Sequence, residues 1–273
     1  MVKLTQFIEN DRKVSSVVLK NGVITEIKKR ILEPHVLANL VRAFHVTVQQ
    51  SEVEFQRFFE NVVYEYLDEN INDMSINDLV MAANYAFTTY SEEKINPQIV
   101  EFINLALSNI TNLNESGLMH LLHIVLKVEY NETFLRETKN IITKTDIEYE
   151  QIMSDIERQM FYSFKQPSVD LNIFPVMFSM ACSTRITPAG VASYLTNYFL
   201  SIHKSLNRQD LVMIFSGVCN YKLEGYYGHM LTSVFLEYYR NDRKRLSLEQ
   251  RIVYFSSFVI MQKTNDFVIP GDV

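Results

Sequence analysis

The sequence predicts an all-α protein, built as an α-solenoid of about six helical-hairpin repeats with one inserted helix. The first observation is the scarcity of chain breakers, because 273 residues contain only 7 Gly and 6 Pro. An all-β chain of this length would need many more turns. The second is a set of similar apolar segments that recur along the chain, and the third is a capping residue before nearly every one.

The recurring segments superpose without gaps, and their first shared apolar residue is here named position 1. Position 1 is held by Leu37, Leu79, Leu118, Phe174, Leu211 and Ile252. The intervals are roughly 37 to 42 residues, as in helix-pair repeats, except one that is about 17 residues longer. Positions 1, 4 and 8 are apolar in all six repeats. We therefore expect a buried seam at helical spacing in each repeat.

Helix start signals precede these segments. Ser, Asn or Asp side chains accept hydrogen bonds from the free N–H groups of a first helical turn. The candidates are Ser75, Asn114, Asp170, Asn207 and Ser247, with Glu33 followed by Pro34 as a weaker start. Ser75-x-x-Asp78 and Ser247-x-x-Gln250 resemble capping boxes, in which both ends of the motif bond to backbone.

The domain organisation follows from the repeats. Second amphipathic helices are expected at 51–68, 96–109, 131–143, 187–204 and 226–240. The solenoid is expected to cover 33–273, with the inserted helix near 145–166. Residues 1–32 form an N-terminal extension that fits either helices or a β-hairpin around Asn21-Gly22.

Position 6 is polar in every repeat and is the first candidate for an interaction surface. It is held by Arg42, Asn84, His123, Ser179, Ser216 and Ser257. A polar column on otherwise apolar helices predicts a solvent-facing stripe. The stripe is either just the wet side of each helix or a row of side chains that meets an extended ligand.

The last second helix adds aromatic and basic candidates. Its tyrosines, Tyr226, Tyr227, Tyr238 and Tyr239, exceed what one helix face can bury. They are expected to pack against a neighbouring repeat or a partner, because Tyr is enriched at interfaces. The basic run Arg240, Arg243, Lys244 and Arg245 suits a helix C-terminus, or else contacts phosphate of a lipid headgroup or of RNA.

The composition argues against several classes of function. A net charge of −6 makes nucleic acid a less expected main partner than protein, since phosphate binding needs a basic face. His120-x-x-His123 would need further ligands to hold a metal, and Cys182 and Cys219 suit small buried thiols. The sequence contains no Gly-rich phosphate loop or nucleophile elbow, so neither an enzyme nor a cofactor is expected. No apolar run is long enough for a transmembrane segment.

The apolar repeat pattern resembles the degenerate helical repeats of organellar proteins. These are the octatricopeptide and heptatricopeptide arrays and the helical region of FAST-kinase-type and RAP-domain proteins. The resemblance covers roughly residues 33–265, and this chain lacks a RAP module and any Trp. It implies an α-solenoid in mitochondria or chloroplasts and usually RNA processing.

We therefore predict a non-catalytic accessory subunit or scaffold of a larger mitochondrial assembly, with the respiratory chain or ATP synthase favoured. An organellar RNA-binding repeat protein or a mitoribosomal subunit is the alternative. The expected partners are other protein subunits. The expected location is peripheral and mitochondrial, without a cleaved presequence, since residues 1–11 carry acidic side chains and no signal-peptide core.

Overall fold

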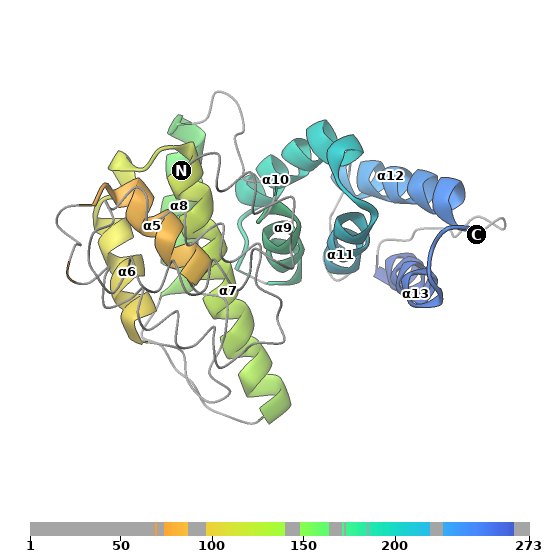
Figure 1. The fold of residues 1–273 in the computed structure, drawn as a ribbon, viewed down its shortest axis with the longest axis horizontal. Helices are drawn as coiled ribbons and strands as arrows, with labels where there is room; N and C mark the ends of the chain where they lie inside the picture. The colour runs from red at the N-terminus through yellow and green to blue at the C-terminus, as the bar shows by residue number, and fades with distance from the viewer. Residues whose placement is uncertain are drawn as a thin grey trace, which may run out of the picture. The chain divides into compact units, whose positions relative to one another are not determined.

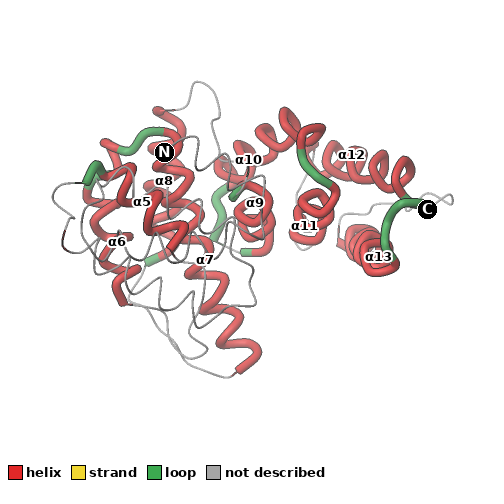
Figure 2. The backbone as a smooth tube through the Cα atoms, in the orientation of Figure 1, coloured by secondary structure: helices red, strands yellow, loops and turns green. Residues whose placement is uncertain are grey.

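A computed structural model shows the fold of the protein. It describes residues 69, 74–86, 97–139, 148–163, 171, 173–184, 186–218 and 226–264. Throughout these ranges the regular structure is helical and includes no strand, which confirms the predicted all-α class (Figure 2). The chain divides into two compact units, residues 1–148 and 149–273. The alternatives for residues 1–32, the first repeat and the helix at 51–68 lie outside the described residues.

The first unit contains α5 (Ile76–Ala86), α6 (Pro97–Ser108), a short 3₁₀ turn (Ile110–Asn112) and α7 (Glu115–Lys139). Helices α5, α6 and α7 all pack against one another. Residues 117–128 of α7 are buried without interruption, so this half of α7 is covered on every side.

Helix α7 corrects one prediction. The expected second helix at 131–143 is not separate, because α7 runs unbroken to Lys139. The reason is local: between Gly117 and Lys139 the chain has neither Gly nor Pro, so nothing ends the helix where the hairpin turn was expected.

The second unit holds the remaining six described helices (Figure 1). They are α8 (Tyr149–Ser163), α9 (Phe174–Ser183), α10 (Ala189–Ile202), α11 (Arg208–Val218), α12 (Tyr226–Asp242) and α13 (Leu248–Thr264). Helix α8 lies in the segment predicted for the insertion. Helices α9, α11 and α13 follow one another in a row, with α11 packed against both neighbours, while α10 contacts α8, α9 and α12.

Position 1 of the predicted seam is buried in four repeats and exposed in the last. Leu79, Leu118, Phe174 and Leu211 are all buried, whereas Leu37 lies outside the described residues. Ile252 is exposed, so the prediction is wrong for α13. Its buried residues are Tyr254, Ser257, Phe258 and Met261, which repeat the spacing of Leu211, Ile214, Phe215 and Val218 in α11. The inward face of α13 therefore lies two residues later than the gapless superposition placed it.

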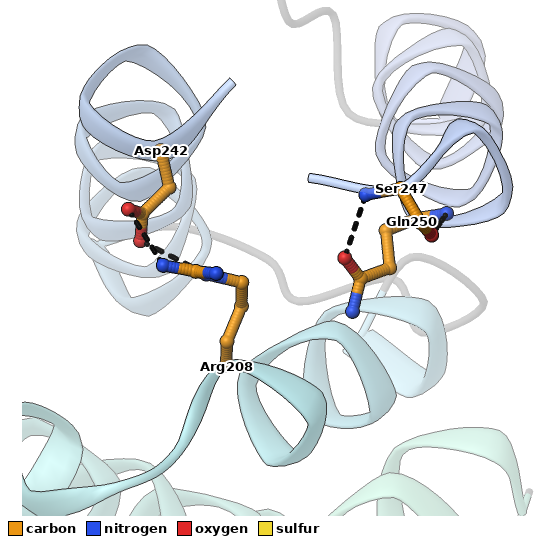
Figure 3. Close-up of polar contacts among 4 residues, drawn as sticks. All are labelled: Arg208, Asp242, Ser247 and Gln250. Atoms are coloured by element: carbon orange, nitrogen blue, oxygen red, sulfur yellow. Dashed lines mark hydrogen bonds and ion pairs between the residues drawn. The ribbon is translucent and has the colours of Figure 1, made fainter. Parts of the chain in front are cut away.

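The caps predicted at Ser75, Asn114, Asn207 and Ser247 form, but the box predicted at Ser75-x-x-Asp78 is incomplete, because Asp78 Oδ2 accepts from Ser75 Oγ at 2.7 Å. At the start of α13, the Gln250 N–H donates to Ser247 Oγ at 3.2 Å and the Ser247 N–H donates to Gln250 Oε1 at 3.0 Å, a complete capping box (Figure 3). Three more caps accept in the same way: Ser75 from the Asp78 N–H (3.2 Å), Asn114 from the Gly117 N–H (2.8 Å) and Asn207 from the Asp210 N–H (2.9 Å).

Aromatic rings fill the centre of the second unit. The ring of Phe215 in α11 lies 4.3 Å from that of Phe235 in α12, measured between centroids. It also lies 5.0 Å from Tyr254 and 4.9 Å from Phe258, both in α13. Ring contacts at about these separations stabilise a fold beyond what burial of the ring surfaces contributes. Through Phe215, helix α11 is packed against both α12 and α13.

Candidate functional site

The position-6 column does not form the predicted solvent-facing stripe. Asn84, His123 and Ser257 are buried, Ser179 is half-buried, Ser216 is exposed and Arg42 lies outside the described residues. The prediction is therefore wrong for Asn84, His123 and Ser257. Each has a physical reason, which differs between the two units.

In the first unit, Asn84 belongs to a buried polar cluster between α5 and α7, and His123 lies in the stretch of α7 that is buried on every side. The Asn84 amide Nδ2 lies 2.8 Å from His120 Nδ1. The Lys127 ammonium, in a side chain only 7% exposed, donates to the backbone carbonyl of Asn84 at 3.1 Å and to its Oδ1 at 3.3 Å. Burial of these groups is tolerated because hydrogen bonds replace those lost to water.

The cluster of Asn84, His120 and Lys127 holds α5 and α7 in position, and its side chains are not arranged as a catalytic site. One Asn84 side chain serves both His120 and Lys127, which lie two turns apart on α7. This fixes α5 against α7 in a single register, a role for which buried polar groups are well suited. Within the described ranges, no group of three or more His, Cys, Asp or Glu side chains lies together as a metal site. The pair His120-x-x-His123 is part of this packed interior.

In the second unit, close packing of α11 on α9 partly covers Ser179. Gly217 of α11 approaches Ser179 of α9 so closely that a Cβ on Gly217 would lie 2.6 Å from Ser179 Cα and 2.7 Å from its carbonyl oxygen. The absence of a side chain at Gly217 is therefore what half-buries Ser179. Ser257 is buried for a different reason, since the inward face of α13 is shifted by two residues.

The tyrosines of α12 pack inside their own unit wherever they are described. Tyr239 packs its ring against Tyr254 and Phe258 of α13, at 5.6 and 5.8 Å. The Tyr238 hydroxyl donates to the His203 carbonyl at 3.0 Å. Burial lowers the pKa of His203 and raises that of Tyr238. The side chains of Tyr226 and Tyr227 lie outside the described part. Packing against a neighbouring helix thus accounts for Tyr238 and Tyr239.

The predicted basic residues gather at the turn between α12 and α13. Arg240, Arg243, Lys244 and Arg245 are all exposed; the last three form a turn, here called the basic turn. The Asp242 carboxylate beside it is engaged by Arg208 of α11, at 3.0 Å from Nη2 and 3.4 Å from Nε (Figure 3). Arg208 therefore pairs with the carboxylate that directly precedes the basic turn.

Sequence reasoning missed an apolar stripe on α13. Leu248, Ile252 and Phe255 are 73%, 55% and 56% exposed, and Val259 is half-buried. Their intervals of four, three and four residues place them on one side of the helix. Ile252 and Phe255 occupy positions 1 and 4 of the repeat pattern, so the superposition assigned them to the core. We name these four residues the α13 seam.

A groove of about 710 Å³ lies between α8 and α10. It is lined by Ser154, Glu157, Arg158, Met160, Phe161, Gly190, Ser193, Tyr194 and Asn197. Glu157 accepts the Gly190 N–H at 2.7 Å, so this carboxylate stabilises the start of α10. The lining has no His, Cys or paired carboxylates, so it does not suggest catalysis. Cys182 lies elsewhere, buried and in no disulfide, and Cys219 lies outside the described residues.

The comparisons with known proteins provide no assignment. No family model matches the chain, and neither a curated protein nor a solved structure matches it. None of the described helices has the length and apolar content needed to cross a membrane. Any function therefore has to be argued from the surfaces described above.

Proposed function

We propose that this protein is a non-catalytic scaffold, an accessory subunit that binds another protein of a larger assembly. The proposal includes an α-solenoid of helical hairpins, supported by the row α9, α11 and α13 and by the recurrent caps. A mitochondrial assembly, with the respiratory chain or ATP synthase favoured, rests on the resemblance of the repeat pattern alone.

The observation that carries the proposal is the α13 seam. Three large apolar side chains in line are each more than half exposed, although the opposite side of the same helix is buried. Polar residues flank them, among them Arg251, Ser256 and Gln262. An exposed apolar patch rimmed by polar groups is typical of a protein interface.

The test is affinity purification of the tagged full chain from its own cells. Ile252→Glu and Phe255→Glu place a charge in the seam, whereas Gln209→Glu places one on an exposed polar site of α11. We expect Gln209→Glu to retain the partners of the wild-type chain and both seam variants to lose them. All three variants should melt like the wild type, because the substituted side chains are exposed. Retention of the same partners by the seam variants would refute the proposal.

An organellar RNA-binding protein is the second candidate, and the basic turn is the observation that favours it. Phosphate-driven binding weakens steeply between about 50 and 200 mM salt, while apolar protein contacts change little. The same purification, repeated across this salt range and with ribonuclease, separates the two functions. Partners lost on ribonuclease treatment would favour RNA, and partners retained in every condition favour the scaffold.

A further inference from the structure

The geometry of the α13 seam indicates what kind of structure covers it. Leu248, Ile252, Phe255 and Val259 alternate intervals of four and three residues, the spacing of positions a and d in a coiled coil. The β-branched Ile252 and Val259 then hold a, and Leu248 and Phe255 hold d. The four seam residues form the narrow contact line of a helix pair, and Ile260, which is 37% exposed, lies to one side of this line. A helix lying on a membrane needs a broader apolar face.

The charges around the seam define the partner further. Between residues 243 and 255 the chain carries four cations, Arg243, Lys244, Arg245 and Arg251, against one carboxylate, Glu249. All five side chains are exposed. Asp242, next in the chain, is bound by Arg208. The N-terminal end of the seam is therefore positive on a chain whose net charge is −6.

A second copy of this chain complements that charge poorly. Side by side in parallel, two copies would bring their basic turns together, and like charges repel. In the antiparallel arrangement each basic turn would face the other end of the seam, whose exposed Ser256 and Gln262 are uncharged. A complementary surface has to supply carboxylates, and among the described residues from Arg243 to Gln262 neither arrangement supplies more than Glu249.

We infer that the α13 seam binds a single amphipathic helix of another protein, with Leu or Ile at coiled-coil spacing and acidic residues beside the basic turn. This inference rests on the proposed scaffold function and specifies its partner. The apolar seam provides most of the binding, and the cations select for acidic helices and set their direction along α13.

Two synthetic helical peptides test this inference against the full chain. Both carry Ile at a and Leu at d over three heptads, with Glu at every e and g position in one and Lys in the other. By fluorescence anisotropy at about 50 mM salt, the acidic peptide should bind about tenfold more tightly than the basic one. Raising the salt to about 500 mM should remove most of the difference, because salt screens exposed charges.

Protein variants locate the interaction. Ile252→Glu should abolish binding of the acidic peptide, and Arg245→Glu should reduce its advantage over the basic peptide at least about threefold. The matched control is Arg158→Glu on α8, a charge reversal at an exposed arginine outside the seam, which should change neither affinity.

Four results would overturn the inference. The first two are failure of both peptides to bind and equal or tighter binding of the basic peptide. The third is a dimer, detected by light scattering, that Ile252→Glu dissociates. The fourth is binding to vesicles of seven parts phosphatidylcholine to three parts phosphatidylserine, detected by flotation, that Ile252→Glu abolishes. The affinity purification proposed above uses no synthetic peptide, so it tests the scaffold function separately. Partners lost there with Ile252→Glu would preserve the scaffold function even if the acidic peptide did not bind.

Discussion

The α5–α7 pair and the α11–α13 pair use different chemistry for the same task of packing two helices. Between α5 and α7 lies a buried polar cluster of Asn84, His120 and Lys127, on helices whose other buried residues include Ala83 and Leu121. Between α11 and α13, aromatic rings meet around Phe215. Hydrogen bonds are directional and fix one register, whereas aromatic packing gains energy mainly from the area removed from water.

This difference bears on why position 1 of the repeat pattern is buried in α5 and α7 but exposed in α13. An Asn that bonds to His and Lys has few alternative positions, so α5 and α7 have little freedom to slide. An apolar face tolerates a shift so long as large residues recur at helical spacing. Helix α13 has two such faces, Tyr254–Phe258–Met261 and the α13 seam, and only packing decides which one is buried.

The largest effect is expected at the aromatic centre. Phe215→Ala should lower the free energy of unfolding by about 3 to 5 kcal/mol, because it opens a cavity between α11, α12 and α13. Leu121→Ala in α7 should cost about 2 to 5 kcal/mol by the same mechanism. Urea denaturation with unchanged m-values measures both. A loss below about 1 kcal/mol at Phe215 would show that the ring contacts do not hold these helices together.

The polar cluster should respond to loss of one partner. Asn84→Ala removes the side-chain acceptor of the buried Lys127 ammonium, which keeps its bond to the residue 84 carbonyl, and also the group that bonds to His120. It should cost about 1 to 3 kcal/mol. The control is Asn104→Ala on the exposed side of α6, which should change stability by about 0.5 kcal/mol or less. Equal losses for the two variants would mean that the cluster does not fix the register of α5 and α7.

The sequence was sufficient for the helices that have clear start and stop signals. Ser75, Asn114, Asn207 and Ser247 mark helix starts because a cap is a contact between residues three apart in the chain. The prediction that one helix ends and another begins near residue 131 was wrong, because that part of the chain has no residue that ends a helix, and α7 continues through it.

The candidate surface was less accessible to sequence reasoning. Whether a polar residue at position 6 faces water depends on a neighbour distant in the chain: Lys127 for Asn84, and Gly217 for Ser179. The α13 seam had a local signal in its four-three-four spacing, but that spacing also fits a core face. An exposed seam and a core face with this spacing differ only in which side of the helix packs against its neighbours. That depends on tertiary contacts, which the local sequence does not contain.

Two adjacent residues of α11 sharpen the comparison within the second unit. Gly217→Ala would force a Cβ against the backbone of Ser179, and should cost about 1 to 3 kcal/mol of unfolding free energy. Ser216→Ala, one residue earlier on the exposed side, should cost less than about 0.5 kcal/mol. Thermal melts of the two variants provide the measurement. A Gly217→Ala variant as stable as Ser216→Ala would mean that α9 and α11 can separate without penalty.

The smallest effect is expected at Ile252, which the repeat pattern placed in the core. Ile252→Ala removes a side chain that is 55% exposed, so part of the lost contact was with water already. Ala also has a higher helix propensity than Ile, which offsets some of the remaining loss. The net change in unfolding free energy should be within about 0.5 kcal/mol. Phe258→Ala on the inward face of the same helix should cost about 3 to 5 kcal/mol. If the order were reversed, with Ile252 the costlier position, α13 would be packed in the register of the gapless superposition. The α13 seam would then belong to the core, and it could not bind a partner.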